Sequence, residues 1–189
     1  VPHPFKFNNG GSEEGKQALV NAVHYSNGST PEEKEEYDRA AKFLQSINSE
    51  SSELILSEIR DADRKEYLLK WTLVQLLKNA VLDESAKGLS AIIDIEMPSD
   101  LTPSEDDYIE EIMVRTNAIE ALKVFAIAGN SDCLTYIKGH LHHTEFSVRR
   151  AAYFACLDLL GSEARQELNK LLMPADQTRL SGRNKRSVI

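Results

Sequence analysis

The apolar residues of this chain recur every three to four positions over most of its length, which is the spacing of amphipathic helices. The first such stretch follows Ser12, a residue that can cap a helix, and extends to about residue 26. A second begins at Thr30-Pro31-Glu32-Glu33, where Thr at the cap, Pro at the first position and Glu at the third predict a capping box. The side chains expected on its buried face are Tyr37, Ala41, Leu44 and Ile47.

Seven further segments with helical spacing follow along the chain. Their predicted ranges are 51–60, 63–82, 85–95, 104–129, 131–142, 145–160 and 162–172. Gly129-Asn130 and Gly161 mark helix ends, because such residues tolerate the left-handed backbone of a C-cap. No stretch shows a convincing period of two, so we expect an all-α fold of about eight or nine helices. The short connections predict that these helices stack as antiparallel hairpins.

The predicted organisation is one helical domain between two segments that lack helical spacing. Residues 1–11 contain Pro and Gly and are interpreted as an extended arm or linker. Residues 12–173 form the helical-repeat domain, and residues 174–189 are expected to be a flexible basic tail. No stretch of about 18 uncharged apolar residues is present, so we expect no transmembrane segment.

An internal repeat with an offset of 34 residues links two predicted helical hairpins. Val114-Arg115 recurs as Val148-Arg149, and Ala118 recurs as Ala152. The further pairs that keep this register are Ala121 with Ala155, Phe125 with Leu159, Leu134 with Leu168 and Ile137 with Leu171. Such a repeat predicts stacked hairpins, because one hairpin cannot bury its apolar face alone whereas neighbours in register bury a continuous core. We expect acids of neighbouring repeats to hold the two arginines, which come early in their helices.

These residues also carry a resemblance. The segment from Val148 to Ala155 resembles the second helix of a HEAT-type repeat, with Val-Arg followed by small residues. The stretch 114–172 is similar to the superhelical domain of vitellogenin-type large lipid transfer proteins. The residues that carry the second resemblance are Ala118 to Leu122, Gly129-Asn130, Leu134, Ile137, Leu141 and Val148-Arg149. It implies an α-solenoid with a right-handed superhelix, and only the scaffold portion, since the lipid cavity of that family is built with large β-sheets.

The charge of the chain is divided into two parts of opposite sign. The net charge is −8, which argues against a nucleic-acid partner, because such proteins need cations to displace counterions from phosphate. Residues 179–189 carry +4, so the rest of the chain carries −12. Arg183-Asn184-Lys185-Arg186 before Ser187 looks like a furin-type proprotein cleavage site. A basic tail or a localisation signal is the alternative.

Three further features bear on the compartment. Asn27-Gly28-Ser29 is an N-glycosylation sequon in a predicted loop, and with the dibasic site it favours a secreted protein over a cytoplasmic one. Residue 1 is Val rather than Met, so we expect a processed product or a fragment. Cys133 and Cys156 lie at similar heights on consecutive predicted helices. They form either a disulfide or a pair of free, buried thiols.

The sequence predicts no catalytic, metal or cofactor site. The densest group of ligand-type residues is His140, His142, His143 and Glu145. These histidines lie at a predicted helix end, where they can cap the last carbonyls, and no Cys-x-x-Cys or His-Glu-x-x-His motif accompanies them. Residues 88–111 hold many acids but no calcium-loop pattern, and residues 88–92 fail the nucleophile-elbow pattern at the second Gly.

We therefore expect a non-catalytic interaction or scaffold domain of a secreted precursor, with an unidentified protein partner. The alternative is a lipid-binding or lipid-transport module that resembles vitellogenin-type lipoproteins. An enzyme that uses the histidines is the third hypothesis.

Overall fold

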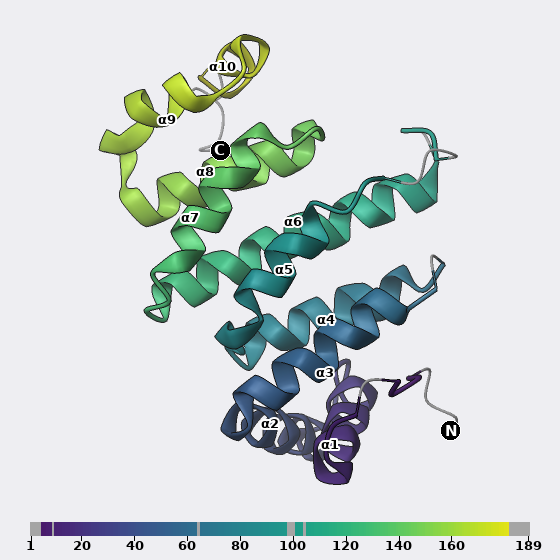
Figure 1. Ribbon diagram of the computed structural model, residues 1–189. Coiled ribbons are helices and arrows are strands. Elements are labelled where there is room, and N and C mark those ends of the chain that lie inside the picture. The colour runs from purple at the N-terminus through teal and green to yellow at the C-terminus, as the bar shows by residue number, and fades with distance from the viewer. Residues whose placement is uncertain (1–4, 9, 64, 98–100, 104, 182–189) are drawn as a thin grey trace.

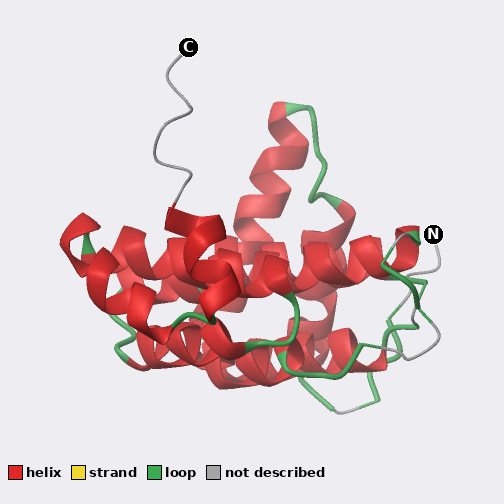
Figure 2. Ribbon diagram, turned by 90° about the horizontal axis from the view of Figure 1, so that it is seen from above, coloured by secondary structure: helices red, strands yellow, loops and turns green. Residues whose placement is uncertain are grey.

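The computed structural model describes residues 5–8, 10–63, 65–97, 101–103 and 105–181. Within these ranges the regular structure is helical and contains no strand, which confirms the predicted all-α class (Figures 1 and 2). The α-helices of the described ranges are α1 (Glu13–His24), α2 (Pro31–Ser46), α3 (Asn48–Asp61), α4 (Tyr67–Asn79), α5 (Ala86–Ile93), α6 (Asp106–Ile127), α7 (Asp132–Gly139), α8 (Phe146–Leu160), α9 (Arg165–Leu171) and α10 (Pro174–Ser181). Short 3₁₀ turns lie at η1 (Asp83–Ser85), η2 (His140–His142) and η3 (Ser162–Ala164).

The helices follow one another in two layers from one end of the molecule to the other (Figure 1). In one layer α4 packs against α6 and α6 against α8. In the other layer α1 packs against α3, α3 against α5 and α5 against α7. Consecutive helices also contact each other, as α1 does with α2 and α5 with α6. Each helix thereby covers the apolar face that its neighbours would otherwise expose.

Most residues of the 34-residue repeat that lie in α6 and α8 belong to the hydrophobic core. Val114, Ala118, Val148 and Ala152 are all buried, at 2% exposure or less. The small side chains of Ala118 and Ala152 allow α6 and α8 to pack closely against each other. The repeat weakens after α8, since Leu171 of α9 is 42% exposed whereas its counterpart Ile137 of α7 is fully buried.

The predicted start of α2 is confirmed at atomic detail. The Glu33 amide donates to Thr30 Oγ1 at 3.2 Å, and the Thr30 amide donates to the Glu33 carboxylate at 3.1 Å. Ser12 caps α1 in a similar way, accepting a hydrogen bond from the Gly15 amide at 3.1 Å. The buried face of α2 contains Ala40 and Leu44, whereas Tyr37 and Ala41 are only partly buried.

Both ends of the described chain pack more closely than the sequence predicts. Phe5 is buried, and the amides of Lys6 and Phe7 donate to the Glu58 carboxylate at 3.0 and 2.8 Å. At the other end, residues 174–181 form α10 rather than the start of a flexible tail. Pro174 begins this helix, a position that proline tolerates because the first amides of a helix bond nothing within it. Asp176 and Leu180 of α10 are 1% exposed, so the helical domain extends to Ser181.

Candidate functional site

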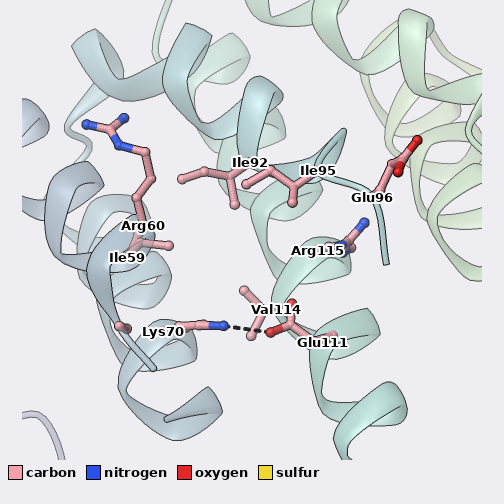
Figure 3. A pocket seen from close by; sticks show the side chains of 10 residues that line it. Ile59, Arg60, Lys70, Ile92, Ile95, Glu96, Glu111, Val114 and Arg115 are labelled. Carbon is pink, nitrogen blue, oxygen red and sulfur yellow. Dashed lines mark hydrogen bonds and ion pairs between the residues drawn. The ribbon is translucent and has the colours of Figure 1, made fainter. Parts of the chain in front are cut away.

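A pocket of about 230 Å³ lies between the hairpin of α3 and α4 and the hairpin of α5 and α6 (Figure 3). Its apolar wall is formed by Ile59, Ile92, Ile95 and Val114. Three of these side chains are buried, whereas Ile95, which follows α5, is 53% exposed at the rim. The pocket therefore offers an apolar surface that is open to solvent.

Charged side chains from the same elements complete the lining. They are Arg60, Lys70, Glu96, Glu111 and Arg115, so the lining carries a net charge of +1 in a chain of net charge −8. Lys70 and Glu111 form an ion pair of 2.7 Å that joins α4 to α6, and each of these side chains is less than 15% exposed (Figure 3). Arg60 bonds to Glu53 of its own helix at 3.0 Å.

Arg115 is the least satisfied of these cations. The residue is 3% exposed, and its Nη1 donates to the Ile93 carbonyl at 3.1 Å, which satisfies one of the last carbonyls of α5. Its Nε is fully buried and has no hydrogen-bond partner within the described ranges. Burial lowers the pKa of Arg115, and its guanidinium lies beyond 4.0 Å from every carboxylate of the described residues. An unpaired buried guanidinium donor is costly, so this position is one that a bound acceptor would stabilise.

Arg149, the repeat partner of Arg115, has the carboxylate that Arg115 lacks. Its Nε donates to Asp176 Oδ2 at 2.5 Å and its Nη2 to Asp176 Oδ1 at 3.2 Å. Its Nη1 donates to the carbonyls of His143 and Thr144 at 2.8 and 2.6 Å. The expectation that acids of a neighbouring element hold the repeat arginines is therefore confirmed for Arg149 and wrong for Arg115.

The histidine region forms a hydrogen-bonded chain rather than an open cluster. His140 is 2% exposed, with its Nδ1 3.2 Å from Asp94 Oδ1 and its Nε2 3.1 Å from Ser90 Oγ. Burial lowers the pKa of His140, so the imidazole is neutral at pH 7. His143 Nε2 lies 3.0 Å from the Ile93 carbonyl, and its Nδ1 accepts a hydrogen bond from the Glu145 amide at 2.9 Å. His142 is exposed and faces solvent.

Ser90, His140 and Asp94 follow the order of a nucleophile, a base and an orienting acid. Acyl transfer also requires N–H donors aimed at the developing oxyanion. Ser90 lies within α5, where the surrounding amides bond to the carbonyls of the preceding turn. We therefore interpret the contacts of His140 with Ser90 and Asp94 as the hydrogen bonds that a buried imidazole requires. They also join α5 and its C-cap residue to η2.

The remaining predicted residues fall in different places. Cys133 and Cys156 are free, buried thiols in the structure, and burial raises their pKa to about 12 and about 11. Asn27 is exposed in the turn before α2. Residues 183–186, with the predicted cleavage residues Arg183, Lys185 and Arg186, lie outside the described residues.

The pocket itself was not predicted from the sequence. The repeat marks Val114 and Arg115, but their neighbours in the pocket come from three other segments as well as from α6. The available signal was the run of acids between Asp94 and Glu111, of which Glu96 and Glu111 line the pocket. The spacing of Ser90 and Asp94 places them one helical turn apart, but nothing in it indicates His140 as their partner.

Within the described ranges, no three His, Cys, Asp or Glu side chains are grouped so that they could hold a metal ion. None of the described helices has both the length and the apolar character needed to cross a membrane. No family model, curated protein or solved structure matches this chain. The resemblances to HEAT-type repeats and to vitellogenin-type proteins therefore stay predictions.

Proposed function

We propose that this protein is a non-catalytic interaction domain, an α-solenoid of HEAT-like hairpins that binds a segment of a partner polypeptide. The pocket between the α3–α4 and α5–α6 hairpins carries this proposal, because it joins an apolar wall to charged side chains and opens beside exposed Ile95. A stack of hairpins is suited to such a role, since its surface is extended and its pockets lie between rigid repeats.

The size of the pocket favours a side chain over a large ligand. Sites for drug-sized molecules occupy roughly 300–1,000 Å³, whereas this pocket measures about 230 Å³. One or two side chains of a partner segment fit such a volume. The rest of the partner segment would contact the helices that flank the pocket.

The proposal places the domain in a secreted precursor. Asn27 is exposed and follows α1 in a turn, so an oligosaccharide at this position would not disturb the core. Expression in a secretory host, followed by mass analysis before and after deglycosylation, tests this part. An unmodified Asn27 in the secreted chain would count against it.

Selection of displayed peptides on the full chain tests the interaction role without knowledge of the native partner. We expect enriched peptides whose binding is lost in Ile95→Glu, because the new carboxylate lies at the rim of the pocket. Ile127→Glu is the matched control, since Ile127 is 71% exposed at the far end of α6. No enriched peptide, or peptides that bind Ile95→Glu as well as Ile127→Glu, would contradict the proposal.

A lipid-binding module is the second candidate, and the apolar wall of the same pocket favours it. Native mass spectrometry of the purified chain separates the two candidates. A bound lipid that Ile95→Glu removes would support lipid binding, and a spectrum of the polypeptide mass alone would count against it.

A further inference from the structure

The two repeat arginines show what the pocket at Arg115 lacks. They occupy equivalent positions 34 residues apart in the repeat, with Arg149 in the first turn of α8 and Arg115 near the middle of α6. Each donates Nη1 to at least one backbone carbonyl of a preceding segment. At Arg149 the Nε and Nη2 groups are taken by the carboxylate of Asp176, which α10 supplies. At Arg115 the Nε has no partner among the residues that the structure describes, and a pocket lies beside the side chain.

We propose that the pocket binds the side-chain carboxylate of an acidic residue in a partner polypeptide, which pairs with Arg115 as Asp176 pairs with Arg149. The inference rests on the proposed function and names the chemistry that the partner must present. In Figure 3 the guanidinium of Arg115 points to the side of the pocket where Ile95 and Glu96 lie, and this is the side from which we expect the carboxylate to approach.

The geometry of the repeat supports a carboxylate over other acceptors. A planar guanidinium matches the two oxygens of a carboxylate, as the pairing of Arg149 with Asp176 shows in this chain. The apolar wall formed by Ile59, Ile92 and Val114 requires that a branched apolar side chain accompany the acid. A small inorganic anion would leave this wall uncovered.

The charges around Arg115 allow one more anion. Asp94, Glu111 and Glu145 are the carboxylates whose charges act on the guanidinium. Two of them have closer partners, since Glu111 bonds to Lys70 and Glu145 accepts a hydrogen bond from the Tyr108 hydroxyl. Asp94 bonds to His140. These three acids are therefore engaged elsewhere, and the buried Nε of Arg115 has no hydrogen-bond partner among the described residues.

A matched pair of short peptides tests the inference on the full chain. The probes are acetyl-Asp-Leu-amide and its neutral counterpart acetyl-Asn-Leu-amide, titrated at one ionic strength and followed by the ¹H–¹⁵N resonances of the pocket amides and of the arginine Nε–H groups. We expect the Asp peptide to bind at least about tenfold more tightly, because a hydrogen bond to a charged group contributes about 1.5–3 kcal/mol. One Nε–H resonance should move downfield, and it should be the one that Arg115→Lys removes.

Variants assign the binding to the pocket. Arg115→Lys keeps a positive charge but removes the planar guanidinium, which can donate two parallel hydrogen bonds to one carboxylate. The preference for the Asp peptide over the Asn peptide should therefore fall to less than about threefold. Ile95→Glu should weaken the Asp peptide about tenfold or more through repulsion, while Ile127→Glu leaves it unchanged. Both isoleucines are exposed, so a loss of fold does not account for a difference between these two variants.

Three outcomes overturn the inference. Equal binding of the Asp and Asn peptides removes the role of the carboxylate, and the interaction role of the pocket stands if both depend on Ile95. Inorganic phosphate or dodecanoate that moves the Arg115 Nε–H resonance at lower concentration than the Asp peptide reassigns the pocket to a free anion or a lipid. No shift of the Val114 and Arg115 resonances at 10 mM peptide, a concentration far above the weakest useful affinity of about 1 mM, refutes the pocket as a binding site for acidic segments.

Discussion

Arg149 is the residue that attaches the last helix to the rest of the molecule. Its guanidinium holds Asp176 of α10 while its Nη1 bonds to the loop before α8. The Phe146 ring contacts both Arg149 and Arg179, whose guanidinium carbons lie 5.7 and 4.9 Å from its centre. Arg149 therefore connects α8, α10 and the loop before α8.

Removal of Asp176 should release α10. We expect Asp176→Ala to cost about 3 kcal/mol of docking free energy, because it leaves a buried guanidinium without its partner. Trypsin cleavage after Arg179, measured by mass spectrometry, should become about 100-fold faster, since cleavage follows the population of the open form. Glu167→Ala is the control, because Glu167 belongs to an exposed pair with Lys170, and equal cleavage rates in the two variants would be inconsistent with the role of Asp176.

His140 should make stability depend on pH. Its pKa is lowered in the folded chain, mainly by burial, so below about pH 6.5 the unfolded chain binds more protons than the folded one. Stability should therefore fall as the pH decreases through this range, by at most about 1.4 kcal/mol per pH unit from this residue. Urea unfolding at pH 7.5 and 5.5 should show a smaller pH effect for His140→Gln than for the native chain. His142→Gln, at an exposed position, should keep the native pH effect.

The two cysteines provide a test of the alternatives that the sequence left open. If Cys133 and Cys156 are buried thiols, as in the structure, a thiol reagent should label the native chain at least about 100-fold more slowly than the unfolded chain. If both Cys133 and Cys156 are labelled in denaturant without reductant, both are free thiols. No labelling under those conditions would instead identify a disulfide.

At the scale of the element, close contacts between helices limit which residues fit. A Cβ at Gly88 in α5 would lie 2.4 Å from Leu56 Cδ1 of α3, and Leu56 is 4% exposed. Gly139, the last residue of α7, has helical backbone angles and nothing within 4 Å of such a Cβ. The same substitution should therefore have opposite effects in the two helices.

We expect Gly88→Ala to lower the free energy of unfolding by about 1–3 kcal/mol, because the core between α3 and α5 must move apart. Gly139→Ala should raise it by about 0.4–1 kcal/mol through the reduced freedom of the unfolded chain. Urea unfolding of both variants is the measurement. A loss of stability in Gly139→Ala as large as in Gly88→Ala would show that the clash with Leu56 is not the cause.

The helix boundaries show how far local sequence determines an element. The start of α2 follows from Thr30 and Glu33, since both capping hydrogen bonds lie within four residues. The helix predicted for 63–82 is shorter, because the apolar spacing begins only at Tyr67, which is where α4 starts. The helix α10 was missed, because its stability depends on Arg149, a residue 27 positions away from Asp176.

At the scale of the whole molecule, stability should decrease from the centre to the ends. α6 packs against α4, α5, α7 and α8, whereas α1 and α10 have fewer neighbours. In such a stack the stability of each hairpin depends on its own free energy and on its interfaces. The ends should therefore open more readily than the centre.

Hydrogen exchange measures this difference directly. We expect the amides of α4, α6 and α8 to exchange with opening free energies at least about 2 kcal/mol above those of α1, α2, α9 and α10. Asp176→Ala should accelerate exchange in α9 and α10 alone. Uniform protection from α1 to α10 would indicate that the chain unfolds in one cooperative step instead.

The helical class, the capping of α2 and the buried repeat positions such as Ala118 and Ala152 follow from the amino-acid sequence alone. These features depend on residues within one or two helical turns, or on a spacing that recurs along the chain. The carboxylate partner of Arg149 and the pocket beside Arg115 become known only from the packing of the helices. That difference depends on which distant segment packs over each arginine, because the charge, the burial and the unpaired Nε of a side chain become defined only when its neighbours are in place.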